Sequence, residues 1–241
     1  MHKIIKILCL LLFLAISTPN HAYNQNKPGQ GPRLPEPMVF DLVLPLGAKK
    51  GEYEFNTLSQ YNLRHKSTDV NPEFEYAYAK GHGVEFELPT HNSVTEAYKL
   101  SLQGTFNFLN TDRFIHGWQY IGEYHRKDKG YENDLLYLFG YQFNEKWSTL
   151  NMTGFRLADI KSKGVVDGLL NGNIFYTFSN RFLLGLEINW EARTNLSNIV
   201  LFMPQVHVYL AKHAKLQFGF GLQHIHHHNT PHAGARIIFG F

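Results

Sequence analysis

The chain ends on "ARIIFGF" (residues 235–241), so its last position is an aromatic residue. Terminal residues usually fray, because they find few partners to hold them in place. Ile237, Phe239 and Phe241 are spaced by two, which is the period of a β-strand. We therefore expect a terminal strand on which these three side chains share one face. The rest of the sequence has to explain what that face contacts.

The same alternation of apolar with polar or small residues recurs along most of the chain. Such segments, bounded by turn residues, are typical of half-buried strands. The sequence predicts an all-β fold with about twelve strands, at 52–61, 73–80, 83–89, 96–108, 114–126, 134–143, 147–157, 168–178, 182–193, 199–210, 215–225 and 233–241.

The links between these strands alternate in length. Tight turns are expected at 81–83, 110–112, 144–146, 179–181 and 211–213, and longer links at 62–72, 90–95, 127–133, 158–167, 194–198 and 226–232. Short turns at one end and longer loops at the other are typical of a transmembrane, antiparallel, up-and-down β-barrel. An even number of strands places both ends of residues 51–241 on the short-turn, periplasmic side.

A soluble barrel would show the same alternation, but its outer face would be rich in Lys and Glu. Here the polar set of several later strands is mainly Gln, Asn, Ser, Thr and Gly, and the apolar set carries almost no charge. A charged lipid-facing residue costs about 2–4 kcal/mol at the bilayer midplane, so this pattern favours the membrane barrel. Residues 147–157 are ambiguous, because neither the face with Trp147 and Phe155 nor the face with Leu150 and Met152 is clean; we expect a bulge there.

The start of the chain predicts export. Residues 1–22 combine Lys3 and Lys6 with an apolar run at 7–16 and a small polar stretch, which is the layout of a signal peptide. Its removal would also remove Cys9, the single cysteine, and would leave 21 basic and 20 acidic residues (23 minus 2, against 20). This balance gives no reason to expect a nucleic-acid partner. Residues 23–50 are expected to form an irregular periplasmic segment that lies partly in the barrel mouth, and residues 51–241 the barrel.

With its signal peptide, alternating strands and terminal "ARIIFGF", the chain resembles Gram-negative outer-membrane β-barrels. The resemblance implies an outer-membrane location, contact with outer-membrane lipids and lipopolysaccharide, and a terminal strand that the barrel-assembly machinery reads through Ile237, Phe239 and Phe241. In addition, "NPEFEYAYAKGHGVEFELP" (71–89) resembles a hairpin of outer-membrane transporters linked to the meta pathway of phenol degradation.

The inward-facing set of the predicted barrel contains the candidate functional residues. Carboxylates dominate the first strands, and rings of Asp or Glu select cations in pores. Alternatively, these carboxylates fill a polar interior and pair with basic residues across it. The residues expected to line the lumen are Glu54, Glu73, Glu75, Glu85, Glu87, Lys99, Glu187 and Arg236.

Two other motifs suggest chemistry. "HIHHHNTPH" (224–232) places His224, His226 and His228 at strand spacing, where they could converge on Zn, Cu or Ni, or could simply form a solvated loop. "LPTHNSV" (88–94) places His91 and Ser93 two residues apart, as a base and a nucleophile of a lipid-active hydrolase would be, although no orienting group is evident.

Twelve strands enclose a narrow interior, which the 23–50 segment would narrow further. The sequence therefore predicts a narrow passive channel for small solutes or hydrophobic compounds, without a cofactor and not an enzyme. A metal-handling barrel, a lipid-active hydrolase and an adhesin remain alternatives.

Overall fold

The computed structural model describes residues 31–40, 42–158, 164–194 and 196–241. The signal peptide predicted at 1–22 lies outside these residues, as do residues 23–30 of the predicted irregular segment. Among the described residues, no helix is long and apolar enough to cross a bilayer.

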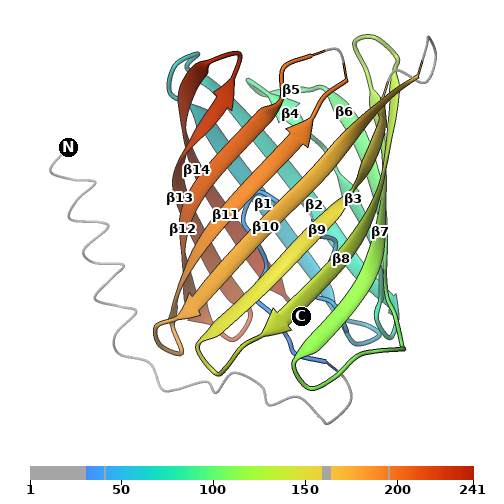
Figure 1. Ribbon diagram of the computed structural model, residues 1–241, viewed down its shortest axis with the longest axis vertical. Helices are drawn as coiled ribbons and strands as arrows, with labels where there is room; N and C mark the ends of the chain where they lie inside the picture. Colours follow the sequence, from blue (N-terminus) through green and yellow to red (C-terminus); the bar gives the residue numbers. More distant parts are fainter. Residues whose placement is uncertain (1–30, 41, 159–163, 195) are drawn as a thin grey trace, which may run out of the picture.

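The described chain forms one antiparallel sheet that closes on itself, as Figure 1 shows. Neighbours in sequence are neighbours in the sheet, and the barrel closes where the first strand pairs with both the second and the last. The twelve long strands are β1 (Tyr53–Asn62), β2 (Ser67–Ala79), β3 (His82–Glu87), β6 (Ala97–Thr105), β7 (Phe114–His125), β8 (Tyr131–Gln142), β9 (Trp147–Ala158), β10 (Val165–Thr177), β11 (Phe182–Ala192), β12 (Ile199–Ala211), β13 (Ala214–Ile225) and β14 (His228–Gly240). The predicted twelve-stranded all-β barrel is confirmed.

Two short strands, β4 (Thr90–His91) and β5 (Val94–Thr95), form a small hairpin in the link between β3 and β6. This hairpin pairs with the start of β2, through Val70 opposite Thr90. It lies at the upper end of the barrel in the view of Figure 1, whereas the C-terminus lies at the lower end. The terms "upper end" and "lower end" refer to that view throughout.

Several predicted boundaries are wrong. Strand β2 begins at Ser67 rather than residue 73, so only residues 63–66 link it to β1. Strand β6 ends at Thr105, which makes the β6–β7 link longer than the predicted tight turn at 110–112. The predicted long link at 226–232 is a two-residue turn, in which His226 and His227 both have positive φ (49° and 64°). Turn chemistry misled the prediction, because His is not a residue that usually marks a tight hairpin.

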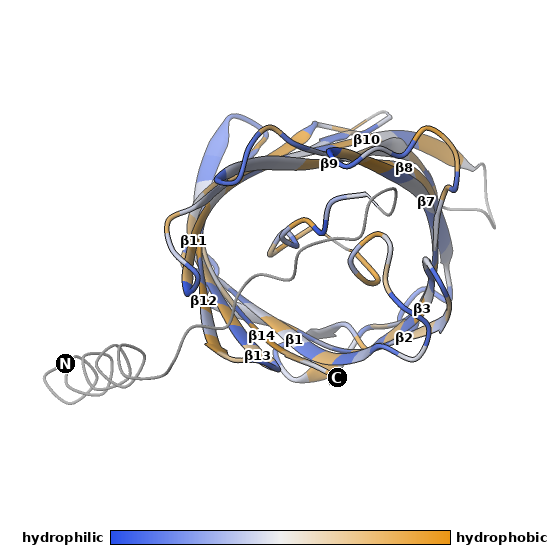
Figure 2. Cartoon of the chain, turned by 90° about the horizontal axis from the view of Figure 1, so that it is seen from below, coloured by the Kyte–Doolittle hydropathy of each residue, from blue (hydrophilic) through white to orange (hydrophobic). Residues whose placement is uncertain are grey.

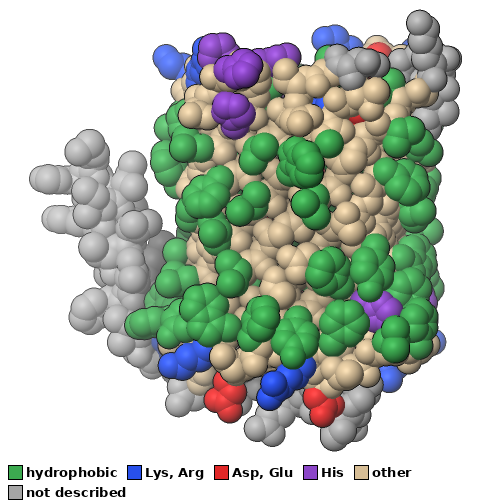
Figure 3. Space-filling view, viewed as in Figure 1, with side chains coloured by type: hydrophobic (Ala, Val, Ile, Leu, Met, Phe, Trp, Pro, Cys, Tyr) green, Lys and Arg blue, Asp and Glu red, His purple; other side chains and the backbone are tan. Residues whose placement is uncertain are grey.

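The outward face is apolar. The three terminal side chains Ile237, Phe239 and Phe241 are exposed on this face, and aromatic residues gather near both ends of the strands. Figure 3 shows apolar side chains over the barrel wall and charged ones near its ends. The aromatic residues near the lower turns include Phe143, Trp147 and Phe178, and those near the upper loops include Tyr61, Tyr98 and Trp190. This distribution is typical of the two interfacial girdles of a membrane barrel.

The interior of the barrel is occupied by the N-terminal part of the described chain. Residues 31–40 and 42–50, which we name the plug segment, form no strand and run inside the barrel, as the view along its axis shows (Figure 2). The segment enters at the lower end, where Gly31 lies against Ile115, and returns there, where Gly81 N donates to Ala48 O (2.7 Å). The sequence predicts that residues 23–50 lie partly in the barrel mouth; the described part of this segment contacts inward side chains of the barrel wall.

Apolar side chains of the plug segment explain an unexpected feature of the inner wall. Phe40, Leu42 and Leu46 pack in one buried cluster with inward residues of β7 to β11, among them Leu150 and Met152. The pairing of β9 with both neighbours is continuous through these positions, so the predicted bulge is absent. The inward face of β9 is apolar at Leu150 and Met152 because these two side chains contact the plug segment rather than water.

Candidate functional site in the barrel interior

The predicted lumen residues all come from inward positions of the strands. Their side chains are buried in the interior, apart from Glu54, which is partly buried. The register places Glu75 directly opposite both Glu54 and Glu85, and Glu73 opposite Glu87. Like charges directly opposite each other destabilise a sheet, so this wall needs compensating groups.

Arg236 of β14 supplies the main compensation. Its Nη2 lies 2.8 Å from Glu73 Oε2 and 3.6 Å from Glu75 Oε1, and its Nε donates to Asn56 Oδ1 (3.0 Å). Lys99 of β6 forms an ion pair with Glu87 in the same way. Glu73, Glu75 and Glu87 therefore each lie within ion-pair distance of a basic residue in the interior.

Despite these ion pairs, one region of the wall formed by β2 and β3 is rich in carboxylate oxygens. Glu73, Glu75 and Glu85 each offer an oxygen within 4.8 Å of the other two. Glu85 Oε1 accepts from Ser101 Oγ (2.9 Å), while Oε2 is buried and has no hydrogen-bond partner among the described residues. This region can attract a cation.

A second group of inward residues holds the plug segment. Glu187 of β11 accepts hydrogen bonds through Oε2 from the backbone N–H groups of Met38 (3.1 Å) and Val39 (3.0 Å). Lys215 of β13 pairs with Glu36, and Gln217 Nε2 donates to Glu36 O (3.0 Å). The polar part of the inner wall therefore fixes a chain segment as well as lining a lumen.

Sequence reasoning missed Gln103, Gln205 and Gln217 as functional residues. Gln103 Nε2 donates to Leu44 O (2.6 Å), and Gln205 Nε2 donates to Glu187 Oε2 (3.2 Å). The alternation predicts that these side chains point inward, but nothing in the local pattern indicates that the plug segment supplies the partners of Gln103 and Gln217.

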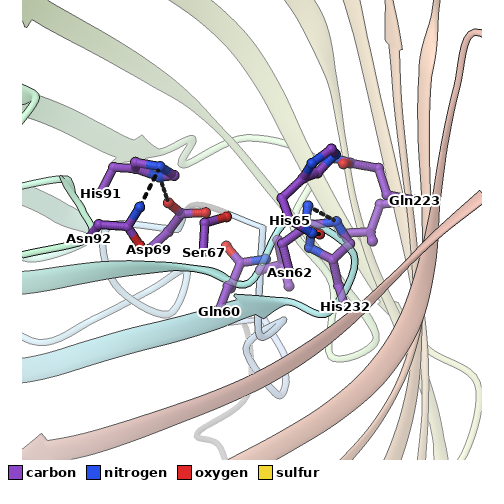
Figure 4. A pocket seen from close by; sticks show the side chains of 11 residues that line it. Gln60, Asn62, His65, Ser67, Asp69, His91, Asn92, Gln223 and His232 are labelled. Carbon is purple, nitrogen blue, oxygen red and sulfur yellow. Dashed lines mark hydrogen bonds and ion pairs between the residues drawn. The ribbon is translucent and has the colours of Figure 1, made fainter.

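Above the plug segment lie two cavities that share Val39, Leu201 and Gln223 in their walls. The first, of about 630 Å³, is lined mainly by neutral polar side chains and histidines at the upper ends of the strands (Figure 4). The second, of about 310 Å³, has apolar walls from Phe40, Leu136 and Met152 and a group of charged side chains. In that group, Arg156 Nε and Nη2 each donate to Asp134 at 2.9 Å.

The three histidines predicted to hold a metal are all exposed at the upper end. His226 Nδ1 lies 2.5 Å from Ser197 Oγ, and His224 Nδ1 lies 2.8 Å from Asn229 Oδ1. Among the described residues, the group whose ligand atoms lie close enough together for a metal ion consists of the carboxylates of Glu73, Glu75 and Glu85, and not of these histidines. Binding of Zn, Cu or Ni by His224, His226 and His228 stays a prediction.

His91 and Ser93 are not arranged as the sequence suggested. Asn92 and Ser93 have positive φ (48° and 68°) and form the turn between β4 and β5, so His91 and Ser93 do not share a strand face. His91 does have an orienting group, because its Nδ1 lies 2.6 Å from Asp69 Oδ1. The hydrogen bond with Asp69 raises the pKa of His91.

The comparisons place this architecture among known outer-membrane channels. The KdgM porin has a TM-score of 0.64 at 13% identity, over 78% of this chain and 99% of that one. The NanC porin has a TM-score of 0.63 at 7% identity, over 77% and 98%. An outer-membrane channel from Pseudomonas putida F1 has a TM-score of 0.53 at 15% identity, over 86% and 100%.

A known sequence family matches a smaller part of the chain than the solved structures do. Residues 33–126, from the plug segment to the end of β7, match a family described as HAEPLYID-like. No curated protein matches the chain significantly. The structural likeness establishes the fold, a closed barrel similar to those of outer-membrane porins.

Proposed function

We propose that this protein is a narrow passive channel of the outer membrane, with the lower end toward the periplasm, and that small solutes pass through it under the control of the plug segment. The observation that carries the proposal is the closed barrel with two cavities directly above a segment held by polar contacts. A solute that enters the upper end reaches Val39 and Phe40, and has to pass beside the segment or displace it.

The charge of the inner wall suggests a preference for cations over anions. One structural neighbour is described as the KdgM porin in complex with disordered oligogalacturonate, which is a polyanion. In this chain the wall of β2 and β3 carries Glu73, Glu75, Glu85 and Glu87, of which Glu85 has an oxygen without a partner among the described residues. A polyanion would meet like charges there, so an acidic oligosaccharide is disfavoured.

Hydrophobic solutes remain part of the proposal. The resemblance of residues 71–89 to transporters linked to phenol degradation suggests such compounds, and the apolar walls of the smaller cavity would accommodate them. The expected contacts with lipopolysaccharide and with the barrel-assembly machinery also stay predictions.

The proposal is tested by ion conductance of the purified protein in planar bilayers. We expect small conductance with a preference for K⁺ over Cl⁻, and we expect Glu85→Gln to reduce that preference. Glu145→Gln is the matched control, because Glu145 is exposed in the β8–β9 turn. A folded barrel that conducts no ions would contradict the channel, and an unchanged selectivity in Glu85→Gln would contradict the role of the carboxylates.

A further inference from the structure

The larger cavity at the upper end is built from a regular set of strand positions. Inward residues two apart on β1 (Gln60 and Asn62) stand opposite inward residues two apart on β2 (Asp69 and Ser67). On the other side of β1 the same wall continues through β14 and β13, to Gln223. The hairpin of β4 and β5 adds His91 and Asn92, and Val39 of the plug segment also lines the cavity.

The charges of the lining limit the kind of ligand that fits. Among the residues that the structure describes, no Lys or Arg lines this cavity, so the wall offers an anion no permanent positive charge. Asp69 is the single carboxylate of this described lining, and it is already held by His91. Figure 4 shows this pair on one side of the cavity and His65, Asn62 and His232 on the other. A strongly charged ligand of either sign is therefore a poor match for this wall.

The polarity of the lining limits the ligand further. Val39 and Leu201 are the only apolar side chains of the described lining, so a purely hydrophobic compound would leave most of the wall without partners. Gln60, Ser67 and Gln223 make no side-chain hydrogen bond among the residues that the structure describes, and each offers both a donor and an acceptor. Such groups match a neutral molecule with several hydroxyls, each of which also donates and accepts.

We propose that this cavity binds a free, uncharged, polyhydroxylated solute of the size of a mono- or disaccharide, through Gln60, Ser67 and Gln223. A volume of about 630 Å³ lies within the range of small-molecule sites, roughly 300–1,000 Å³. The assignment rests on the proposed function, since it names the class of solute that the channel admits first. The bound solute would lie above Val39, and therefore above the segment that it has to pass.

Binding is measured on the folded, full barrel in detergent by saturation-transfer difference NMR and by calorimetry, with glucose and maltose as probes. Galacturonate, glucosamine and phenol are the anionic, cationic and hydrophobic comparisons. We expect the neutral sugars to bind more tightly than all three. Tighter binding of any of the three, or no binding of either neutral sugar, would overturn the assignment.

The double variant Gln60→Leu/Gln223→Leu should weaken maltose binding about tenfold, as expected for the loss of two neutral hydrogen bonds. Gln142→Leu is the control, since Gln142 lies at the lower end of β8 outside this cavity. Equal affinity of the double variant and the control would overturn the site. Lipopolysaccharide should not compete with maltose, because the lining faces the barrel interior; competition would overturn the assignment to a free solute.

The two proposals fail in different ways. If the protein conducts ions but does not prefer neutral sugars, the assignment of this cavity is overturned and the channel stands. If maltose binds and the double variant weakens it while the barrel conducts nothing, the channel is overturned and the cavity stands.

Discussion

Glu187 is the side chain that holds the plug segment near its middle. It accepts the N–H groups of Met38 and Val39, and also amide groups from Asn189 (2.8 Å) and Gln205 (3.2 Å). Glu187→Gln would replace an acceptor oxygen with an NH₂ group that faces other donors. We expect a loss of about 1–3 kcal/mol of unfolding free energy, measured by urea unfolding in lipid vesicles.

The control for Glu187→Gln is Glu145→Gln, which removes the same charge from an exposed turn. If the two variants unfold at the same urea concentration, the four contacts of Glu187 contribute nothing to the fold.

His91 and Asp69 form an ion pair that depends on pH. The hydrogen bond with Asp69 raises the pKa of His91 above its ordinary value. Because the pKa of His91 is higher in the folded than in the unfolded protein, the ion pair stabilises the folded state fully below the unfolded-state pKa, about 6.5. This stabilisation is lost as the pH rises through the folded-state pKa. NMR titration should show that Asp69→Asn lowers the pKa of His91.

Asp112→Asn is the control for Asp69→Asn, because Asp112 is exposed in the β6–β7 link, away from this pair. It removes the same charge and should leave the titration of His91 as it is in the unmodified protein. An unchanged His91 pKa in Asp69→Asn would contradict the pair.

At the scale of elements, the plug segment is held as much by apolar packing as by polar contacts. Phe40 is 2% exposed and packs with Leu136, Leu150 and Met152 on the inner wall. Phe40→Ala should cost about 3–5 kcal/mol, because it leaves a cavity between the segment and the wall. We expect a lower urea midpoint and a larger conductance, since the loosened segment obstructs the interior less.

Phe108→Ala is the control for Phe40→Ala, because the Phe108 ring is exposed in the β6–β7 link. A lower urea midpoint of Phe40→Ala without any rise in conductance would show that the segment supports the barrel but does not limit passage.

The sequence predicts where the strands lie more reliably than it predicts which side chains of each strand point into the interior. Alternation identified all twelve long strands, because the side-chain period of two is local. It could not assign Leu150 and Met152 to the interior, since their partners Phe40 and Leu42 lie more than one hundred positions away. Alternation also predicted that Glu187 points inward. It could not predict the hydrogen bonds from Met38 and Val39 to Glu187, because these residues lie far away in the sequence.

Glycines show the same limit. A Cβ at Gly219 would lie 2.5 Å from Met38 Cε, and one at Gly140 would lie 2.0 Å from Leu34 Cδ1. In the sequence these glycines look like weak points in β13 and β8. In the structure they are the places where the wall makes room for the plug segment, which is a role that strand glycines have when another part of the chain approaches closely.

At the scale of the whole molecule, closure of the barrel depends on the last strand. Phe241 N donates to Tyr53 O (2.9 Å), and Tyr53 N donates to Phe241 O (3.1 Å). The Phe241 ring also stacks on Tyr53 and His213, with centroids 5.2 Å and 5.5 Å apart. The backbone contacts would survive in Phe241→Ala, whereas the ring contacts would not.

The variant Phe241→Ala distinguishes the structural role of this ring from its predicted role in assembly. Refolded into detergent, Phe241→Ala should lose only about 1 kcal/mol for its aromatic contacts, and its unheated form should still migrate faster on a gel than the boiled form. In cells, we expect the amount of folded barrel in the outer membrane to fall much further. Phe55→Ala is the matched control, since the Phe55 ring is similarly exposed on the outward face and contacts two aromatic rings, but lies on β1 outside the terminal strand. If both variants reach the outer membrane equally, the end of the chain acts through packing alone and is not read as a signal.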